Sequence, residues 1–355
     1  MRKLKMILVG CGGMGNSHAE ALLQTGRVDL GCVVDLDPER ARACQARFGA
    51  ARAGTDFAAE LACAPYDVAV VATIPSQHAA PAIQALERGL HVYCEKPVAA
   101  TLADGEAMLA AARRTGRKLF IGHQLRYAEP FMTIVRDIRG GLLGFPIVMR
   151  MAGNQQTFDA IWEAQKNLLR DTSPIVDCGT HYVNLMLAMN PSRPRLVCAL
   201  GTSIAADVEW PRHYNYGLLQ VKFEDGGVGH YEAGWGPMMT QNAWYIKDFS
   251  GPKGSLSLIV ELDHNTPDNL PTRVKHTLHY RALSDNRYAT VKEHRTVREE
   301  PVGKGESLHG AHAFFLDAIE KDLDISGQLL EAHRSLEVVL AADRSVREER
   351  MVPLL

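Results

Sequence analysis

Short apolar runs alternate with amphipathic stretches along the first third of the chain. Residues 68–73 are apolar at almost every position, whereas residues 102–115 repeat apolar side chains at helical spacing and end at Gly116. Near-continuous apolar strands that alternate with helices are typical of a parallel sheet covered on both faces. The predicted strands are residues 5–9, 30–34, 68–73, 91–94 and 118–122, and the predicted helices are residues 17–24, 38–48, 81–88 and 102–115.

Beyond about residue 140, the pattern changes to alternation by twos. Leu219, Val221 and Phe223 alternate with polar residues, and this run turns at residues 225–227 and returns through residues 228–235. Such a hairpin predicts an antiparallel sheet with one covered face. The further predicted strands are residues 147–151, 195–202, 243–249, 255–260 and 274–281, and the predicted helices are residues 174–189, 309–321 and 328–349.

The two patterns together predict an α/β plus α+β chain. Residues 1–124 are expected to form an N-terminal Rossmann domain on a doubly wound parallel sheet. Residues 125–355 are expected to form a substrate-binding and oligomerisation domain on a large open, mainly antiparallel sheet with helices on one face. The C-terminal helices can pack back on the Rossmann domain. An exposed apolar sheet face favours a homodimer or homotetramer through that sheet.

Composition narrows the class of protein without identifying it. The 355 residues are 46% hydrophobic and 23% charged, as in ordinary globular proteins, and the net charge is −2. No basic excess favours a nucleic-acid partner, and no apolar run approaches the ~20 residues that span a bilayer. The seven cysteines are scattered without a Cys-x-x-Cys pair, and the apolar run 6–9 is too short for a signal peptide. We therefore expect a cytoplasmic protein with no nucleic-acid or membrane partner.

A glycine-rich turn lies between the first predicted strand and the first predicted helix. The stretch from Gly10 to Gly15 fits the pattern Gly-x-Gly-x-x-Gly. The first glycine makes a tight turn, the second lets a pyrophosphate approach the backbone, and the third allows close helix–strand packing. The helix N-terminus then faces the phosphates with its dipole. The residues predicted from this turn to bind the cofactor are Gly10, Gly12, Gly13, Met14 and Gly15.

Asp35 ends the second predicted strand, about twenty residues after Gly15. A carboxylate there accepts hydrogen bonds from the adenosine ribose hydroxyls and repels a 2′-phosphate, so NAD is favoured over NADP. Asp37 already fits the N-cap of the next helix, which leaves Asp35 for the ribose. The arginines that follow keep NADP open, and Leu36 is included in the predicted cofactor site.

Three later motifs follow the Rossmann pattern in order. They are the segment 73–78, the triplet Glu95-Lys96-Pro97 and the Asp-x-Gly-x-His stretch 177–181. Together, over essentially the whole chain, they resemble the Gfo/Idh/MocA family, which includes glucose–fructose oxidoreductase and inositol dehydrogenase. The resemblance implies an NAD(P)-dependent oxidoreductase with its active cleft between the two domains. It also implies that the cofactor is contacted by Thr73, Pro75, His78, Glu95, Lys96 and Gln124.

The resemblance also implies which groups are catalytic. Lys96 would bond the reacting hydroxyl and the nicotinamide ribose. Asp177 and His181, spaced i and i+4, share one face of the predicted helix 174–189. A histidine titrates near neutral pH and takes the hydroxyl proton as hydride leaves carbon, while Asp177 orients it or binds a neighbouring hydroxyl. The alternative is a helix N-terminal aspartate beside a buried, satisfied histidine.

Two positions depart from the family's pattern. Thr172-Ser173-Pro174 replaces a run of glycines, and Asn184 stands where an acidic residue is common. The helix entry and substrate contacts therefore need not follow those of inositol dehydrogenase. No metal site is predicted, because the His-x-x-His pairs at 276–279 and 309–312 lack acidic or cysteine partners at ligand spacing. The candidate substrate contacts are Arg126, Asn154, Trp162 and His181, with packing or surface roles as the alternative.

The motifs favour transfer of a hydride between nicotinamide and a carbinol or carbonyl carbon of a sugar, cyclic polyol or derivative. A cofactor-binding sensor or regulatory protein without turnover remains an alternative. So does a dehydrogenase or reductase of a dihydrodiol, imine or aldehyde, or a mechanism that retains NAD. The identity of the substrate is not determined by these residues.

Overall fold

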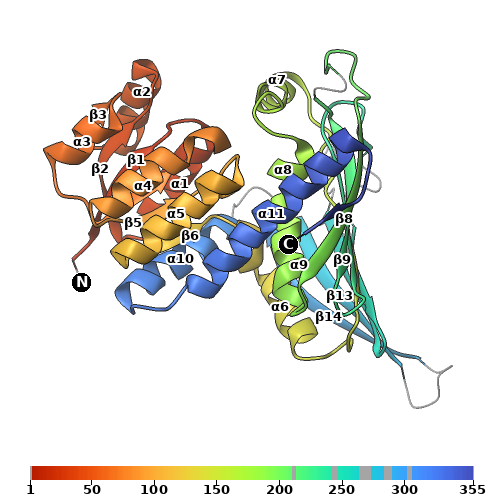
Figure 1. Ribbon diagram of the computed structural model, residues 1–355. Coiled ribbons are helices and arrows are strands. Elements are labelled where there is room, and N and C mark those ends of the chain that lie inside the picture. The colour runs from red at the N-terminus through yellow and green to blue at the C-terminus, as the bar shows by residue number, and fades with distance from the viewer. Residues whose placement is uncertain are drawn as a thin grey trace. The chain divides into compact units, whose positions relative to one another are not determined.

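The structure, a computed structural model, describes residues 2–209, 213–240, 246–263, 273–283, 290–301 and 306–354. The chain divides into two compact units (Figure 1). Unit 1 comprises Met1–Tyr127 and Ser307–Leu336, and unit 2 comprises Ala128–Glu306 and Glu337–Leu355. The first segment of unit 1 ends at Tyr127, three residues beyond the expected domain boundary at Gln124. The C-terminal segment Ser307–Leu336 also belongs to this unit.

Unit 1 is built on a parallel sheet of six described strands in the order β3-β2-β1-β4-β5-β6. The order reverses between β1 and β4, and ligands of such sheets bind outside the carboxyl ends of the strands at this point. The strands are β1 (Leu4–Val9), β2 (Val28–Val34), β3 (Arg52–Gly54), β4 (Val68–Val71), β5 (His91–Cys94) and β6 (Leu119–Ile121).

The helices of unit 1 match the predicted alternation. They are α1 (Gly13–Gln24), α2 (Pro38–Phe48), α3 (Phe57–Cys63), α4 (Ala79–Glu87), α5 (Leu102–Thr115), α10 (Glu306–Glu320) and the first part of α11 (Ser326–Glu348), with 3₁₀ turns η1 (Pro75–Gln77) and η2 (Gln124–Tyr127). The short elements β3 and α3 were not predicted, because a three-residue strand and a seven-residue helix carry too little periodicity.

Helix α10 returns to the core of unit 1 from the far end of the sequence (Figure 1). Ala311, Phe315 and Leu316 are fully buried there, in the same cluster as Met6 of β1 and Leu22 of α1. Their spacing of four and five residues places them on one side of the helix. The apolar face of α10 is therefore part of the core that supports the parallel sheet.

Unit 2 is built on a mixed sheet of nine described strands in the order β14-β13-β12-β11-β7-β10-β9-β8-β15. Only the β7–β10 pair is parallel among these, so the sheet is mainly antiparallel, as predicted. The strands are β7 (Val148–Ala152), β8 (Pro194–Thr202), β9 (Tyr216–Phe223), β10 (Val228–Gly234), β11 (Lys247–Gly251), β12 (Gly254–Asp263), β13 (Arg273–Leu283), β14 (Thr290–Pro301) and β15 (Val352–Pro353). Of the predicted strand 243–249, residues 243–245 lie outside the described residues.

The helices of unit 2 lie on one side of this sheet (Figure 1). Leu219, Val221 and Phe223 of β9 are buried while Gln220 is exposed, so the alternation read from the sequence marks the covered face. Val148, Leu200 and Ile259 are exposed. The helices are α6 (Glu129–Arg139), α7 (Asp159–Leu168), α8 (Pro174–Asp177), α9 (Gly179–Met189) and the second part of α11. No helix formed by the described residues is long and apolar enough to cross a membrane.

A buried hydrogen-bond network ties the start of α8 to α11 within unit 2. The Tyr214 hydroxyl donates to Asp343 Oδ1 at 2.7 Å and lies 2.8 Å from Ser173 Oγ. Ser173 caps α8 by accepting the N–H of Val176 at 3.2 Å, and Arg347 pairs with Asp343. Burial, with Asp343 beside it, holds the pKa of Tyr214 well above its ordinary value. The hydroxyl therefore stays protonated and donates to the carboxylate.

We expect Tyr214→Phe to lower the free energy of unfolding by about 1–3 kcal/mol, because it removes the hydroxyl that donates to the buried Asp343 Oδ1 and contacts Ser173 Oγ. Tyr93→Phe is the matched control: Tyr93 is fully buried, and its hydroxyl has no hydrogen-bond partner in the described part of the chain. Urea denaturation should give little or no loss for Tyr93→Phe. Equal losses in the two variants would contradict the proposed role of the Tyr214 network.

Candidate functional site

The glycine turn between β1 and α1 has two kinds of glycine. Gly10 has φ of +93°, and a Cβ there would lie 2.5 Å from the carbonyl oxygen of Ala72. A Cβ at Gly15 would lie 1.8 Å from the carbonyl oxygen of Gly10. These two glycines are required by the fold itself. Gly12 and Gly13, in contrast, have nothing within 4 Å of their Cβ positions, so open space lies in front of the turn.

The N-terminus of α1 is not capped by its own side chains. Gly12 is the N-cap residue and makes no side-chain cap bond, and the first turn holds no acidic residue. The first N–H groups of a helix have no partner within the helix, and its dipole makes this end positive. Open space before an uncapped helix start fits a dinucleotide pyrophosphate, as the sequence predicts.

Asp35 follows β2 at the same edge of the sheet. Its carboxylate accepts the N–H of Cys11 at 2.7 Å and the N–H of Asp37 at 2.9 Å. The glycine turn itself therefore orients the carboxylate, which keeps lone pairs for further donors. Asp37 caps α2 through the N–H of Glu39 at 2.9 Å, as predicted. Apolar side chains border this edge: Met14, Leu36 and Ile74 are 41%, 77% and 45% exposed.

The loop after β4 is held by His78. This side chain is buried, and its Nδ1 lies 2.9 Å from the carbonyl oxygen of Pro97 while Nε2 lies 3.1 Å from that of Thr73. Burial lowers the pKa of His78, so a neutral ring donates to one of the two carbonyls at a time. His78 thus links the loop that contains Thr73 and Pro75 to the Lys96-Pro97 segment, whose peptide bond is cis.

Glu95 has a buried carboxylate directly before the half-buried Lys96. It accepts the N–H of Lys96 at 3.1 Å and the side-chain amide of Gln124 at 3.2 Å, and His18 Nε2 lies 2.7 Å away. The structure therefore brings Gln124 into contact with the predicted Glu95-Lys96 pair. His18 was not predicted; its position three residues after Gly15 was the available signal.

Asp177 and His181 lie on two helices rather than one. The predicted helix 174–189 is divided at Cys178, although this residue keeps right-handed helical angles of φ −81° and ψ −41°. The division lies where Gly179 packs against the ring of Tyr231, with the Cβ position 3.3 Å from a ring carbon. Asp177 is buried. In α9, His181 is half-buried, and every other residue from Gly179 to Met189 is buried.

Asn184 follows His181 by three residues on α9. Its side chain is buried, and neither Oδ1 nor Nδ2 has a hydrogen-bond partner among the described residues. An unpaired buried carboxamide lowers stability, and such groups are uncommon in folded proteins. Asn184 is therefore suited to receive an external polar group near His181.

A row of amide side chains follows β7 and reaches the α8–α9 junction. Asn154 Nδ2 donates to Glu232 Oε1 at 2.7 Å, and Gln155 Nε2 lies 3.9 Å from Cys178 Sγ. Gln165 donates to Gln155 Oε1 at 2.8 Å. Of these, only Asn154 was predicted. The polar run 154–156, just after the end of β7, was a signal for Gln155.

The other two predicted substrate contacts have protein partners. Arg126 pairs with Glu331 of α11 within unit 1. Trp162 is buried in an apolar cluster with Leu169, Val208 and Trp235. Trp235 was not predicted; its indole Nε1 is buried and has no hydrogen-bond partner in the described ranges.

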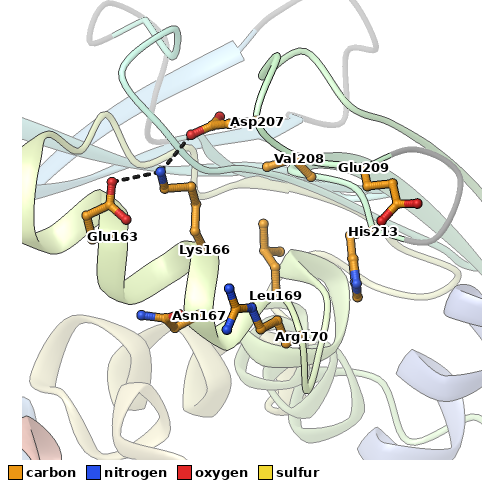
Figure 2. A pocket seen from close by; sticks show the side chains of 9 residues that line it. All are labelled: Glu163, Lys166, Asn167, Leu169, Arg170, Asp207, Val208, Glu209 and His213. Carbon is orange, nitrogen blue, oxygen red and sulfur yellow. Dashed lines mark hydrogen bonds and ion pairs between the residues drawn. The ribbon is translucent and has the colours of Figure 1, made fainter.

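Unit 2 contains a cavity of about 430 Å³ between α7 and the residues Asp207, Val208, Glu209 and His213. Figure 2 shows the side chains that line it. Lys166 projects toward Glu163 and Asp207, with N–O distances of 2.7 and 2.6 Å. None of the predicted site residues lines this cavity. Among the described residues, no three histidine, cysteine or acidic side chains are placed to hold a metal ion.

Comparison with known proteins shows which family of sequences this chain is similar to. A family model described as an oxidoreductase family with an NAD-binding Rossmann fold, GFO_IDH_MocA, matches residues 4–123. D-apiose dehydrogenase of Paraburkholderia graminis is 30% identical over 200 residues, which cover 56% of this chain and 53% of that protein. Inositol 2-dehydrogenase of Acidothermus cellulolyticus is 29% identical over 187 residues, which cover 52% and 53%. The chain thus spans about half the length of the curated relatives it matches.

Solved structures match the fold along the whole chain. A structure of levoglucosan dehydrogenase in complex with NADH and levoglucosan has a TM-score of 0.80 at 21% identity, covering 100% of both chains. At this identity the likeness concerns the fold, a Rossmann sheet followed by a mainly antiparallel sheet with helices. The family model, the glycine turn and the fold together confirm the resemblance read from the sequence. Residues 4–123 belong to the Gfo/Idh/MocA family of NAD-binding oxidoreductases and form an NAD(P)-binding Rossmann domain.

Proposed function

We propose that the protein is an NAD-preferring dehydrogenase that acts on a CH–OH group of a sugar, cyclic polyol or derivative. The observation that carries this proposal is the environment of His181. It is the one half-buried side chain on α9, which otherwise buries every residue. It lies near the carboxamide of Asn184, which has no hydrogen-bond partner in the part of the chain that the structure describes. A titratable group at such a position, in a family of oxidoreductases, is suited to proton transfer.

The cofactor preference rests on Asp35. When bound, NAD supplies the nicotinamide that exchanges a hydride with the substrate. The uncapped start of α1 and the backbone at Gly12 and Gly13 would hold its pyrophosphate, and Asp35 would accept the ribose hydroxyls. A 2′-phosphate would place negative charge against this carboxylate, which favours NAD over NADP.

Three side chains handle the proton and the hydroxyl in this proposal. His181 takes the hydroxyl proton during oxidation and returns it during reduction, and the buried Asp177 positions the reacting region. Lys96, next to the anchored Glu95 carboxylate, holds the substrate oxygen. Acid–base assistance of this kind contributes about 10²–10⁴-fold to a rate, and orientation supplies the remainder.

The proposed substrate class rests on the amides of unit 2 and on the relatives. Asn154, Gln155 and Gln165 offer neutral donors and acceptors, which suit hydroxyl groups better than ionised ones. The relatives are named for D-apiose, inositol and levoglucosan, all polyhydroxylated compounds. We also propose a homodimer or homotetramer through the uncovered sheet face, where Val148, Leu200 and Ile259 are exposed.

Gly12→Ala tests the cofactor site. The variant should fold normally because its Cβ meets nothing within 4 Å, yet it should weaken NADH binding by about ten-fold or more by filling space a pyrophosphate needs. Gly327→Ala, which also meets nothing within 4 Å, is the control. The dissociation constant is measured by NADH fluorescence, beside a thermal unfolding curve. Unchanged NADH affinity in folded Gly12→Ala would refute this placement of the phosphates.

His181→Ala tests the proton transfer. Turnover should fall by about 10²–10⁴-fold while NADH affinity stays the same, because the side chain acts on the substrate proton. The assay mixes protein with NAD or NADP and a panel of sugars and polyols and follows absorbance at the NADH band. His91→Ala, at the amino end of β5, is the control. Equal turnover in wild type and His181→Ala would remove His181 from the mechanism.

Asn184→Leu should separate stability from activity. Replacing a buried, unpaired carboxamide by an apolar side chain of similar shape should raise the free energy of unfolding by about 1–2 kcal/mol and lower turnover. Asn190→Leu is the matched control, since Asn190 is equally buried but accepts the N–H of Ser192 at 2.9 Å. The Asn190→Leu variant should have a lower free energy of unfolding than the wild type. A loss of stability in Asn184→Leu, measured in urea, would argue against an open carboxamide.

A further inference from the structure

Three buried side chains form a chain of contacts across unit 1. His312 Nε2, on α10, lies 2.8 Å from His18 Nδ1, on α1. His18 Nε2 lies 2.7 Å from Oε1 of Glu95, which follows β5. Both imidazoles are fully buried and Glu95 is 4% exposed. Residues separated by almost the whole sequence are thus joined through two short polar contacts.

The protons in this chain can be assigned by chemistry. Each of the two contacts requires one proton, and an ionised carboxylate has none to give, so His18 Nε2–H donates to Glu95. Burial lowers the pKa of His312 to about 3, so this ring is neutral. It either donates from Nε2 to His18 or accepts there from a protonated His18. In both cases the buried His312 Nδ1 has no hydrogen-bond partner among the residues described.

Aromatic rings surround the two imidazoles. The ring centroid of Tyr93 lies 5.0 Å from that of His18 and 4.9 Å from that of His312, and Phe315 packs 5.6 Å from Tyr93. Such rings lower the local dielectric, which strengthens a hydrogen bond to a carboxylate and makes its loss costly. The orientation of the Glu95 carboxylate is therefore tightly determined.

Glu95 connects the two histidines to the proposed site through two further hydrogen bonds. Its Oε2 accepts the backbone N–H of Lys96 at 3.1 Å, and its Oε1 accepts the amide of Gln124 at 3.2 Å. His18 stands on α1, the helix that begins at the glycine turn. The same chain of contacts thus links the phosphate-binding helix, the Lys96 segment and α10.

We propose that His18 and His312 are positioning residues that act on Lys96 and Gln124 through Glu95. The proposal rests on the dehydrogenase function argued above. A purely stabilising role fits less well, because an aromatic cage would be more stable around an apolar residue than around His312, whose Nδ1 has no hydrogen-bond partner among the described residues. The pair is retained at that cost because the carboxylate before Lys96 needs one fixed orientation.

His18→Leu and His18→Gln test this role together. Leucine removes both contacts, whereas the glutamine amide can still donate to Glu95. We expect His18→Leu to lower kcat by about 10- to 100-fold, with KM and the NADH dissociation constant changing far less. His18→Gln should recover most of the loss. Phe315→Leu, which loosens the same cage without touching the polar chain, should lower Tm and keep kcat.

A second readout needs no turnover. Acylation of Lys96 by acetic anhydride, measured by peptide mass relative to exposed Lys253, should be slower in His18→Leu than in wild type. The reason is that a Glu95 carboxylate with one donor fewer favours the unreactive ammonium form of Lys96. His18→Gln should restore the wild-type rate, and Phe315→Leu should not alter it.

The two readouts separate this inference from the proposed function. If no sugar or polyol is turned over but Lys96 labelling follows the expected order, the dehydrogenase assignment fails and the coupling from His18 to Lys96 stands. If wild type turns over and a folded His18→Leu keeps both its kcat and its Lys96 labelling rate, the positioning role is overturned. A fall in kcat that His18→Gln does not recover would also overturn it.

Discussion

The buried carboxylate of Glu95 is the constraint on which the Rossmann unit depends. An ionised carboxylate away from water needs donors from the protein, and α1, the Lys96 backbone and η2 each supply one. His312 of α10 contacts the other ring nitrogen of His18, Nδ1, and so helps to orient this ring. The return of α10 to the N-terminal unit therefore completes a polar network as well as an apolar core, which explains why the unit includes residues 307–336.

Unit 2 supports its own candidate residues in a comparable way. Ser173 caps α8, and the Tyr214–Asp343 contact holds that cap to α11. Thr172-Ser173-Pro174, where the resemblance read from the sequence leads us to expect glycines, is thus a capped helix start with proline at its first position. Asp177 ends α8 and His181 lies in the first turn of α9, so this cap supports the start of the segment that holds both residues.

Local features were predicted well because their causes are local. The glycine turn, the Asp37 cap and the alternation of β9 each depend on residues close together in the sequence. Where the cause lay elsewhere, prediction failed or was incomplete. The division of the helix at Cys178 lies where Gly179 packs on Tyr231, more than fifty residues away in the sequence. The contacts of Gln155 with Cys178 and of Gln165 with Gln155 join side chains from different elements, so no local pattern predicts them.

The sequence by itself determined the fold class, the family of residues 4–123 and the chemical type of most candidate residues, since periodicity and short motifs encode these directly. Only the tertiary structure decided which of those residues have hydrogen-bond partners in the protein, and which residues those partners are. His18 and His312 meet across 294 positions, and the packing around α9 gives the Asn184 carboxamide no hydrogen-bond partner among the described residues. The physical reason is that hydrogen-bond satisfaction in a buried site depends on distant chain segments, whose approach no local pattern specifies.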